Sequence, residues 1–339
     1  MKSLSWTHFM QVGFLFLFAS EFTFYLLILQ TGIVEYHHSD LLQVWMVPTG
    51  GILGIIASIF LYQKRRWLIP PLLLLQLFLS LHYASANGIE LFLMGLISGL
   101  TAPMLIARID RLWLAVLALA LSYTYGTYYF SVPAVERTSI AFFLSAVAFG
   151  ASLFSQIDLK KQSTRFISLY GAGAIFLWLL LDAALFESLS RNEIMHIWGE
   201  HSYTLNIIAF HVLGLIAAYK AREYKHNDAV MVALFFLAYS AYASGWQWML
   251  SLIYPFVISY YNVIILKELM KLPYALLAVM ALSLWGASGM GLLIALKGSF
   301  YVAWALWFIL LLTYIAKYIV VNNHKLRKTL SLWIVTPKS

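Results

Sequence analysis

Cysteine is absent from the 339 residues, so the chain has no disulfide framework, no thiolate metal ligand and no cysteine nucleophile. Charged side chains are scarce: they make up 11% of the sequence, against about a quarter in ordinary soluble domains. There is no Walker loop for ATP, and the glycine pairs at 171–173 and 289–291 lack the third glycine of a dinucleotide site. We therefore expect neither a cofactor nor an enzymatic activity.

Apolar side chains, by contrast, make up 62% of the sequence. A soluble fold of this size would expose far more apolar surface than the few hundred Å² that monomers tolerate. Lipid must therefore be the solvent for most of the chain. We expect a multi-pass protein of the cell inner (plasma) membrane, with the bilayer as a partner.

Short polar stretches divide the chain into apolar segments, each close to the length of about 20 residues that a spanning helix needs. The twelve segments are 9–32, 42–62, 67–84, 89–107, 112–130, 138–157, 166–187, 203–220, 229–244, 248–266, 272–296 and 299–321. The ninth and tenth share one apolar stretch that only the turn signal at 244–248 interrupts. At about 1.5 Å per residue that stretch is too long for one spanning helix, which favours two.

The distribution of basic residues tests this count. With the N-terminus inside, only Arg137, Arg191 and Lys297 of the 22 lysines and arginines fall outside, and the other 19 lie in inner loops or at the ends of the chain. This strong positive-inside bias predicts that both termini are cytoplasmic. The net charge of +8 then reflects topology, so we expect no nucleic-acid partner.

The all-α chain divides evenly around a short polar loop. We predict an N-terminal six-helix half at 1–157, a cytoplasmic connecting loop at 158–165, a C-terminal six-helix half at 166–321 and a basic tail at 322–339. Two halves in the same orientation are typical of parallel-repeat transporters, whose substrate site lies between the halves. The first and seventh helices then become equivalent, and each carries an acid, Glu21 and Asp182.

This layout resembles the major facilitator superfamily over the whole chain. The family's signature between helices two and three combines a glycine, an aspartate and a pair of basic residues; here Lys64, Arg65 and Arg66 supply the basic residues, and Ala57 and Leu61 precede them. The resemblance implies a secondary transporter that moves a small solute by alternating access. It also implies that helices one, four, seven and ten line the central cavity.

Glu21 is the leading candidate for function, because an acid at the centre of a membrane helix costs about 2.5–3.5 kcal/mol on insertion scales. Gln11, Phe18, Glu21 and Tyr25 share one face of the first helix. A carboxylate there could bind a proton or a cationic substrate, which predicts coupling to the proton gradient. The alternative is a structural hydrogen bond to a neighbouring helix.

Further polar residues of the second half complete the predicted cavity. Asp182 is either a second coupling acid or a water-facing residue near the end of its helix, and His211 either relays protons or makes one structural hydrogen bond. Asn206 lies shortly before His211, while Tyr254 and Asn262 of the tenth helix could hydrogen-bond a substrate.

Histidines gather in the outer loops that follow helices one and seven: His37 and His38 in the first, His196 and His201 in the second. Imidazole suits first-row divalent metals, but no fixed ligand spacing is present. A solvated rim is the default interpretation, and the four histidines are weak metal candidates.

Two rival functions share the predicted scaffold. One is an integral membrane enzyme that acts on lipid-linked substrates through Glu35, His37 and His38, although these outer loops are short. The other is a lipid or lipid-precursor flippase, which would need a laterally open apolar cavity. A monomeric transporter of a small-molecule substrate is the function that the sequence favours.

Overall fold

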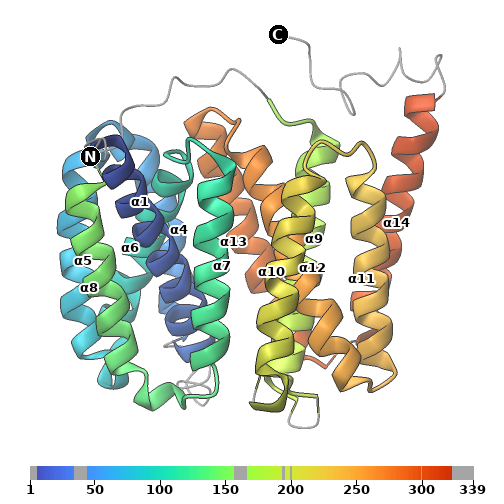
Figure 1. The fold of residues 1–339 in the computed structure, drawn as a ribbon, viewed down its shortest axis with the longest axis horizontal. Helices are drawn as coiled ribbons and strands as arrows, with labels where there is room; N and C mark the ends of the chain where they lie inside the picture. The colour runs from blue at the N-terminus through green and yellow to red at the C-terminus, as the bar shows by residue number, and fades with distance from the viewer. Residues whose placement is uncertain are drawn as a thin grey trace, which may run out of the picture. The chain divides into compact units, whose positions relative to one another are not determined.

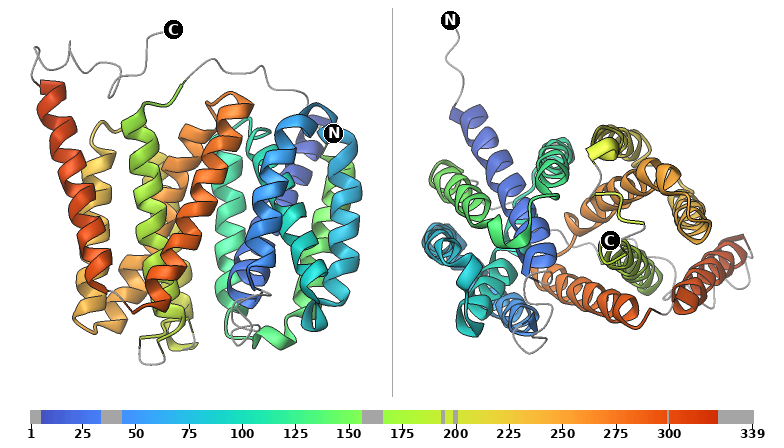
Figure 2. Two further views of the ribbon diagram at one scale, coloured as in Figure 1. Left: turned by 180° about the vertical axis from the view of Figure 1, so that it is seen from behind. Right: turned by 90° about the horizontal axis from the view of Figure 1, so that it is seen from below.

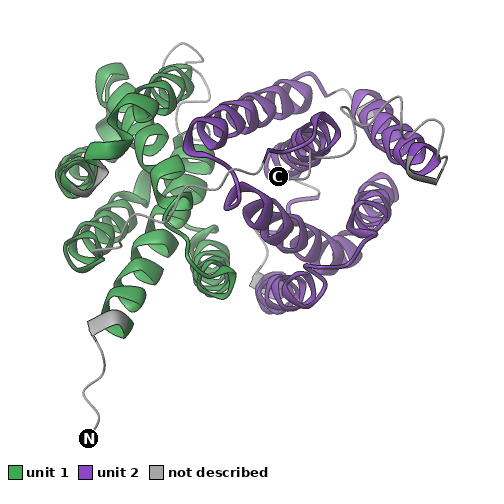
Figure 3. Cartoon of the chain, turned by 90° about the horizontal axis from the view of Figure 1, so that it is seen from above, with its two compact units in different colours: residues 1–161 green, residues 162–339 purple. Residues whose placement is uncertain are grey.

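The computed structural model describes residues 6–33, 44–155, 166–192, 195–198, 201–298 and 300–322. The chain is helical throughout these ranges and contains no strand in them, which confirms the all-α prediction. It forms two compact units, unit 1 at residues 1–161 and unit 2 at residues 162–339 (Figure 3).

Unit 1 contains six long helical segments in its described part (Figure 1). They are α1 (Trp6–Phe24) with its π-helical continuation η1 (Tyr25–Ile33), α4 (Met46–Leu61), α5 (Arg65–Leu81), α6 (Gly88–Ile106), α7 (Leu112–Tyr129) and α8 (Thr138–Phe154). The short 3₁₀ turns η2 (Tyr62–Lys64), η3 (Tyr83–Ser85) and η4 (Ala134–Glu136) lie in the connections.

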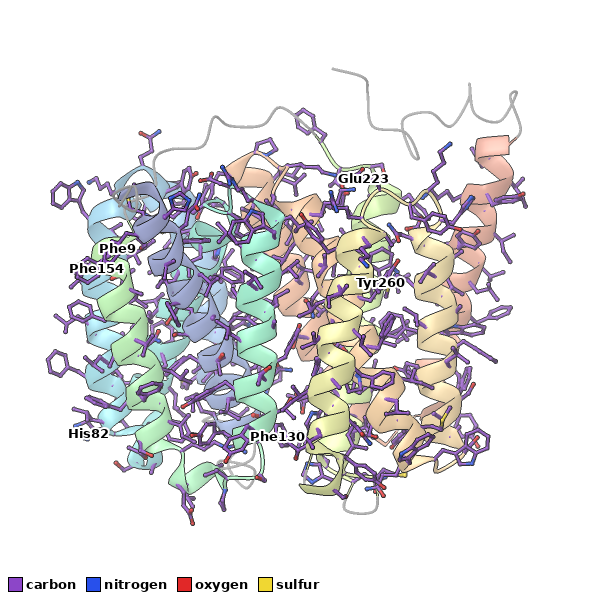
Figure 4. The ribbon with its side chains drawn as sticks, viewed as in Figure 1. Phe9, His82, Phe130, Phe154, Glu223 and Tyr260 are labelled. Carbon is purple, nitrogen blue, oxygen red and sulfur yellow. The ribbon has the colours of Figure 1, made fainter. Side chains whose placement is uncertain are left out.

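The long helices of unit 1 alternate in direction. Phe9 near the start of α1 and Phe154 at the end of α8 meet with their ring centroids 5.4 Å apart, so the first and sixth helices share one end of the unit. His82 and Phe130, which follow α5 and α7, lie at the opposite end (Figure 4). Each helix therefore crosses the unit from one end to the other, and the next helix runs back in the opposite direction.

Unit 2 also contains six long helices in its described part. They are α9 (Leu169–Ser190), α10 (Thr204–Lys220), α11 (Asn227–Ala243), α12 (Gln247–Leu269), α13 (Tyr274–Leu296) and α14 (Phe300–Asn322), with the turn η5 (His201–Tyr203) before α10. Gly245 has a φ of 70° between α11 and α12, a left-handed conformation that glycine adopts readily. The predicted split of the long apolar stretch is therefore confirmed.

The two units use the same helix pairs. In unit 1, α1 packs on α7 and α8, α4 on α6, and α5 on α8; in unit 2, α9 packs on α13 and α14, α10 on α12, and α11 on α14. Within each unit the long helices stand side by side (Figure 2). The common packing plan is that of an internal repeat in which α1 corresponds to α9.

Small residues allow the closest of these contacts. A Cβ atom at Gly95 would lie 2.1 Å from the carbonyl oxygen of Val47, and one at Gly99 would lie 2.1 Å from that of Gly51. In unit 2, a Cβ atom at Gly214 of α10 would lie 2.6 Å from the carbonyl oxygen of Phe256. The backbones of α4 and α6 thus approach more closely than any larger side chain permits.

The outer faces are apolar. Seven helical segments of the described chain have the length and composition of a membrane span, and α14 is among them. Phe60, Trp67 and Tyr301 expose about four fifths or more of their surface. Such faces need a lipid solvent, and helices satisfy their own backbone hydrogen bonds within it. The count of twelve spans and the cytoplasmic position of the termini stay predictions.

Candidate functional site

Glu21 lies in the interior of unit 1, half-buried on α1. Nε2 of Gln76 on α5 donates a hydrogen bond to its Oε1 atom over 2.8 Å. The hydroxyl of Thr101 on α6 lies 3.4 Å from its Oε2 atom. The predicted acid therefore sits where three helices meet, and the two partners that it contacts carry no charge.

A chain of buried polar side chains continues from Gln76 to α8. Nε2 of Gln76 lies 3.4 Å from Oγ of Ser145, and Oγ of Ser145 lies 2.8 Å from Oγ of Ser80. Ser80 donates to the main-chain oxygen of Gln76 over 2.8 Å. All three side chains are buried, so their polar groups depend on one another for hydrogen bonds.

Asp182 occupies the corresponding helix of unit 2 but has a different environment. The hydroxyl of Tyr254 on α12 donates to its Oδ1 atom over 2.9 Å, and that of Tyr261 donates to its Oδ2 atom over 2.6 Å. The side chain is 9% exposed, and α9 continues to Ser190. A water-facing acid at a helix end does not fit this position. The structure brings together the two predicted residues Asp182 and Tyr254.

His211 lies in the packing seam between α10 and α12. Its Nδ1 atom is 2.8 Å from Oγ of Ser259, and its side chain is buried. Asn262 donates from Nδ2 to the carbonyl oxygen of Ile258 on its own helix over 2.9 Å, and Asn206 is partly exposed in the first turn of α10. The sequence allowed His211 either to relay protons or to make one structural hydrogen bond. The contact with Ser259 fits the second alternative.

Two of the three other residues predicted on the face of Glu21, Gln11 and Tyr25, lie before and after it in the chain. Gln11 is partly buried on α1, and Tyr25 is the first residue of η1. Tyr25 packs against the apolar cluster that includes Phe24 and Leu27. Tyr25 therefore lies beside the apolar core of unit 1.

The weak metal candidates fall mostly outside the described residues. His37, His38 and the side chain of His201 lie outside them, and the main-chain oxygen of His196 accepts a hydrogen bond of 3.5 Å from Gln247. Among the residues that the structure describes, no three His, Cys, Asp or Glu side chains form a group that could hold a metal ion.

Sequence reasoning missed the partners of both acids. Gln76 is a single amide in the leucine-rich stretch of α5, and this isolation is a signal that could have found it. Thr101 and Tyr261 carry no such signal, because hydroxyl side chains are common in membrane helices. Whether Thr101 contacts Glu21, or Tyr261 contacts Asp182, depends on which face of α6 packs towards α1 and which face of α12 packs towards α9.

Arg137 is a second omission, because the sequence places it in an outer loop. Its side chain is 1% exposed and donates to the carbonyl oxygens of Phe130 over 2.7 Å, Val132 over 2.8 Å and Leu27 over 3.0 Å. The first two belong to the connection before α8, and Leu27 belongs to η1. Arg137 thus fastens this connection to the π-helical segment that follows Glu21, and π-helical turns are frequent at functional sites.

Ion pairs join helix ends in unit 2. Asp228 at the start of α11 contacts Lys317 of α14 and accepts a hydrogen bond of 3.1 Å from the hydroxyl of Tyr170 on α9. Glu223, labelled in Figure 4, lies 3.0 Å from Nζ of Lys267. The hydrogen bond and positive charge of Lys267 lower the pKa of Glu223. The first pair joins α11 to α14, and the second joins the connection after α10 to α12.

The comparisons with known proteins point to one fold. No family model matches the chain. No curated protein sequence matches it either. Two of the solved structures that resemble it do so at 13% identity, each over 92% of this chain and 99% of the other. They are the human organic anion transporter MFSD10 (TETRAN), with a TM-score of 0.60, and a bacterial homologue of the iron transporter ferroportin in an outward-facing state, with a TM-score of 0.56. Both are transporters of the major facilitator superfamily, and the chain has the fold of that superfamily.

Proposed function

We propose that this protein is a secondary active transporter that moves a small-molecule substrate by alternating access and couples the movement to protons through Glu21. The observation that carries the proposal is a half-buried carboxyl group inside unit 1 whose contacts, Gln76 and Thr101, are neutral. A charge in an apolar span needs compensation, and no neighbouring side chain of this cluster supplies it. A proton is the simplest compensating charge.

The exposure of Glu21 supports an exchangeable proton. Its side chain is only half-buried, whereas Gln76 behind it is fully buried. An acid held by neutral partners can bind and release protons as its access to water changes. This is the property that alternating access requires of a coupling group.

We assign Asp182 an assisting role. Both of its carboxyl oxygens accept bonds from tyrosines of α12, and Tyr239 of α11 donates to the neighbouring carbonyl of Leu181 over 2.7 Å. These bonds tie α9 to α11 and α12. In this proposal Asp182 stabilises the packing of unit 2 while Glu21 of unit 1 exchanges its proton. His211 contributes one structural hydrogen bond between α10 and α12.

The comparisons support a transporter over the two rival functions. Both similar structures are transporters by description, one of organic anions and one a homologue of an iron transporter. The rival enzyme would work through Glu35, His37 and His38, which lie outside the described residues. A flippase shares the scaffold and differs in having a lipid substrate.

The remaining parts of the proposal follow the predicted layout. We place the two halves at 1–157 and 166–321, with 158–165 as the connecting loop and 322–339 as a basic cytoplasmic tail. We place the monomeric protein in the cell inner (plasma) membrane, where a proton gradient is available.

A direct test uses proteoliposomes that contain a pH indicator. A panel of small solutes, including amines, organic acids and sugars, is added outside, and the internal pH is followed. We expect one class of solute to move protons with the wild-type protein and the signal to vanish with Glu21→Gln, which keeps the shape and removes the acid. Glu90→Gln, in the first turn of α6 and away from Glu21, is the matched control. A solute-driven signal that survives Glu21→Gln would refute the coupling assignment.

A further inference from the structure

The connection between α10 and α11 carries an excess of positive charge at one end of unit 2. Lys220 ends α10, and Arg222 and Lys225 follow it. The two lysines are exposed and the arginine is partly exposed. The acid of this stretch, Glu223, lies 3.0 Å from Nζ of Lys267 and is neutralised by it. The three basic side chains, which we call the basic rim, therefore keep a surplus of positive charge.

Other acids at this end of the unit are paired as well. Asp228 contacts Lys317, and Oε1 of Glu268 lies 2.7 Å from Nζ of Lys271. Among the residues that the structure describes, no acid forms an ion pair with a side chain of the basic rim. The rim can therefore meet an anion from outside the chain without the loss of an existing ion pair.

Main-chain oxygens beside the rim are already occupied by donors. Nδ2 of Asn227 donates to the carbonyl oxygen of Ala221 over 3.0 Å, and the hydroxyl of Tyr260 on α12 donates to Oδ1 of Asn227 over 2.7 Å. Nζ of Lys267 contacts the carbonyl oxygen of Arg222. Carbonyl groups at the C-terminal end of a helix would otherwise repel an anion. These bonds also hold the backbone of the connection to α11 and α12.

Tyrosines accompany the rim. The guanidinium carbon of Arg222 lies 4.3 Å from the ring centroid of Tyr219, and Nη1 of Arg222 donates to the carbonyl oxygen of Tyr219 over 2.6 Å. Tyr224 is 54% exposed in the same connection. Tyrosine is enriched at the level of the lipid headgroups. The composition of the connection is therefore that of a membrane–water boundary.

An exposed apolar stripe on α10 leads to the rim. Leu205, Ala209, Leu213 and Ile216 are exposed and recur at intervals of three or four residues, so they lie on one face of the helix. Lys220 continues the same spacing. A ligand that follows the stripe therefore meets the rim at its end.

We infer that an anionic phospholipid binds here, with one acyl chain along the α10 stripe and its phosphate group at the basic rim. Both features fit this ligand, because a soluble phosphate leaves the stripe uncovered and a zwitterionic lipid brings a positive group close to the rim. The positive-inside bias predicts that this end of unit 2 faces the cytoplasm, where anionic lipids make the leaflet surface negative. Binding of this lipid does not depend on proton coupling at Glu21.

The absence of cysteine allows a single reporter to be placed beside the stripe. The full-length variant Ile216→Cys is purified, labelled with bimane and reconstituted into vesicles of equal parts phosphatidylcholine and phosphatidylglycerol. In one set of vesicles the phosphatidylglycerol carries a nitroxide on its acyl chain, and in the other set the phosphatidylcholine carries it. A nitroxide quenches bimane at short range, so the ratio of the two quenching effects measures the preference for the anionic lipid.

We expect stronger quenching by phosphatidylglycerol. Lys220→Gln and Lys225→Gln should each lower the preference by up to about fivefold, which corresponds to the roughly 1 kcal/mol that a basic residue gains near an anionic surface. Adding Arg222→Gln to both should abolish the preference. Lys297→Gln, which removes an exposed positive charge at the other end of α13, should retain it. A reporter at Val279→Cys, exposed near the start of α13, should show equal quenching by the two lipids.

High salt should weaken the preference, because the rim is exposed to solvent. Equal quenching by the two lipids at position 216 would overturn the inference, and so would a preference that survives in the triple variant or appears equally at position 279. Equal quenching together with disulfide-linked dimers of unlabelled Ile216→Cys would assign the stripe to a second copy of the chain. Lys220→Gln and Lys225→Gln replace exposed side chains, so these two variants decide the outcome if the triple variant does not fold.

Discussion

Nε2 of Gln76 lies 2.8 Å from Oε1 of Glu21 and joins α5 to α1 inside unit 1. The bond explains how an acid can be held in an apolar span without a positive partner, because an amide donor stabilises either the ionised or the neutral carboxyl group. The other carboxyl oxygen has only the longer contact of 3.4 Å with the hydroxyl of Thr101. This unequal use of two oxygens distinguishes Glu21 from Asp182, whose two oxygens are both occupied.

Asp182 and Tyr261 should stabilise unit 2 cooperatively. The bond of 2.6 Å between them is buried, and a hydrogen bond to a charged or strongly polar group contributes about 1.5–3 kcal/mol. Asp182→Asn and Tyr261→Phe, alone and together, form a double-mutant cycle measured by chemical unfolding in micelles. We expect a coupling free energy of about 1–2 kcal/mol. Strictly additive effects would show that the bond contributes nothing.

Arg137→Met should destabilise unit 1 by about 3 kcal/mol or more, because the buried side chain serves three main-chain carbonyls that would lose their donor. Arg137→Lys should not restore stability, since one ammonium group cannot reproduce the fork of a guanidinium. The free energy of unfolding is the measurement. Arg191→Met, whose residue is partly exposed and pairs with Glu187, is the control and should change stability by less than about 1 kcal/mol. Equal losses of stability in the two variants would show that the hydrogen bonds of Arg137 to the main chain add no particular stability.

Gly99→Ala should separate α4 from α6. The added methyl group would lie 2.1 Å from the carbonyl oxygen of Gly51, so one backbone must move, at a cost of about 1–3 kcal/mol. Gly126→Ala in α7 is the matched control, because no atom lies within 4 Å of its added methyl group. Alanine also favours a helix over glycine, so the control should be neutral or slightly stabilising. A thermal unfolding midpoint lowered only in the first variant is the expected result.

Glu223 should make stability depend on acid pH. Its lowered pKa means that its contribution is present above the unfolded-state value of about 4.3 and is lost as the pH falls through the lower folded-state value. Lys267→Met removes the largest cause of the lowered pKa and should flatten the stability profile in that acid range. The effect is small because the glutamate is exposed. Unfolding measured at several acid pH values compares the variant with the wild type, and identical slopes would show that the pair does not couple to folding.

Much of the fold was predictable because it depends on local composition. The turn at Gly245 follows from a glycine between two apolar stretches, and the span of α1 follows from its run of apolar residues around Glu21. The acids themselves stand out because membrane helices rarely contain them. Their roles stay proposals, but their positions in the equivalent helices α1 and α9 agree with the predicted repeat.

The partners of those acids were not predictable in the same way. Gln76 lies 55 residues from Glu21, and Tyr261 lies 79 residues from Asp182. A contact over such a separation depends on which faces of two helices meet, and neighbouring faces of an apolar helix are nearly equivalent in composition. For the same reason the sequence placed Arg137 in an outer loop without indicating that it is buried there, where it bonds to Leu27 of η1.

The sequence by itself determined that the chain is helical, that lipid is its solvent and that an acid stands inside its first helix, because hydropathy and charge are properties of single residues and short segments. Only the tertiary structure decided that Gln76 and Thr101 meet Glu21, that two tyrosines enclose Asp182 and that Arg137 is buried. These contacts depend on the rotation and close approach of helices, which glycines such as Gly95 and Gly99 permit and which no local pattern specifies.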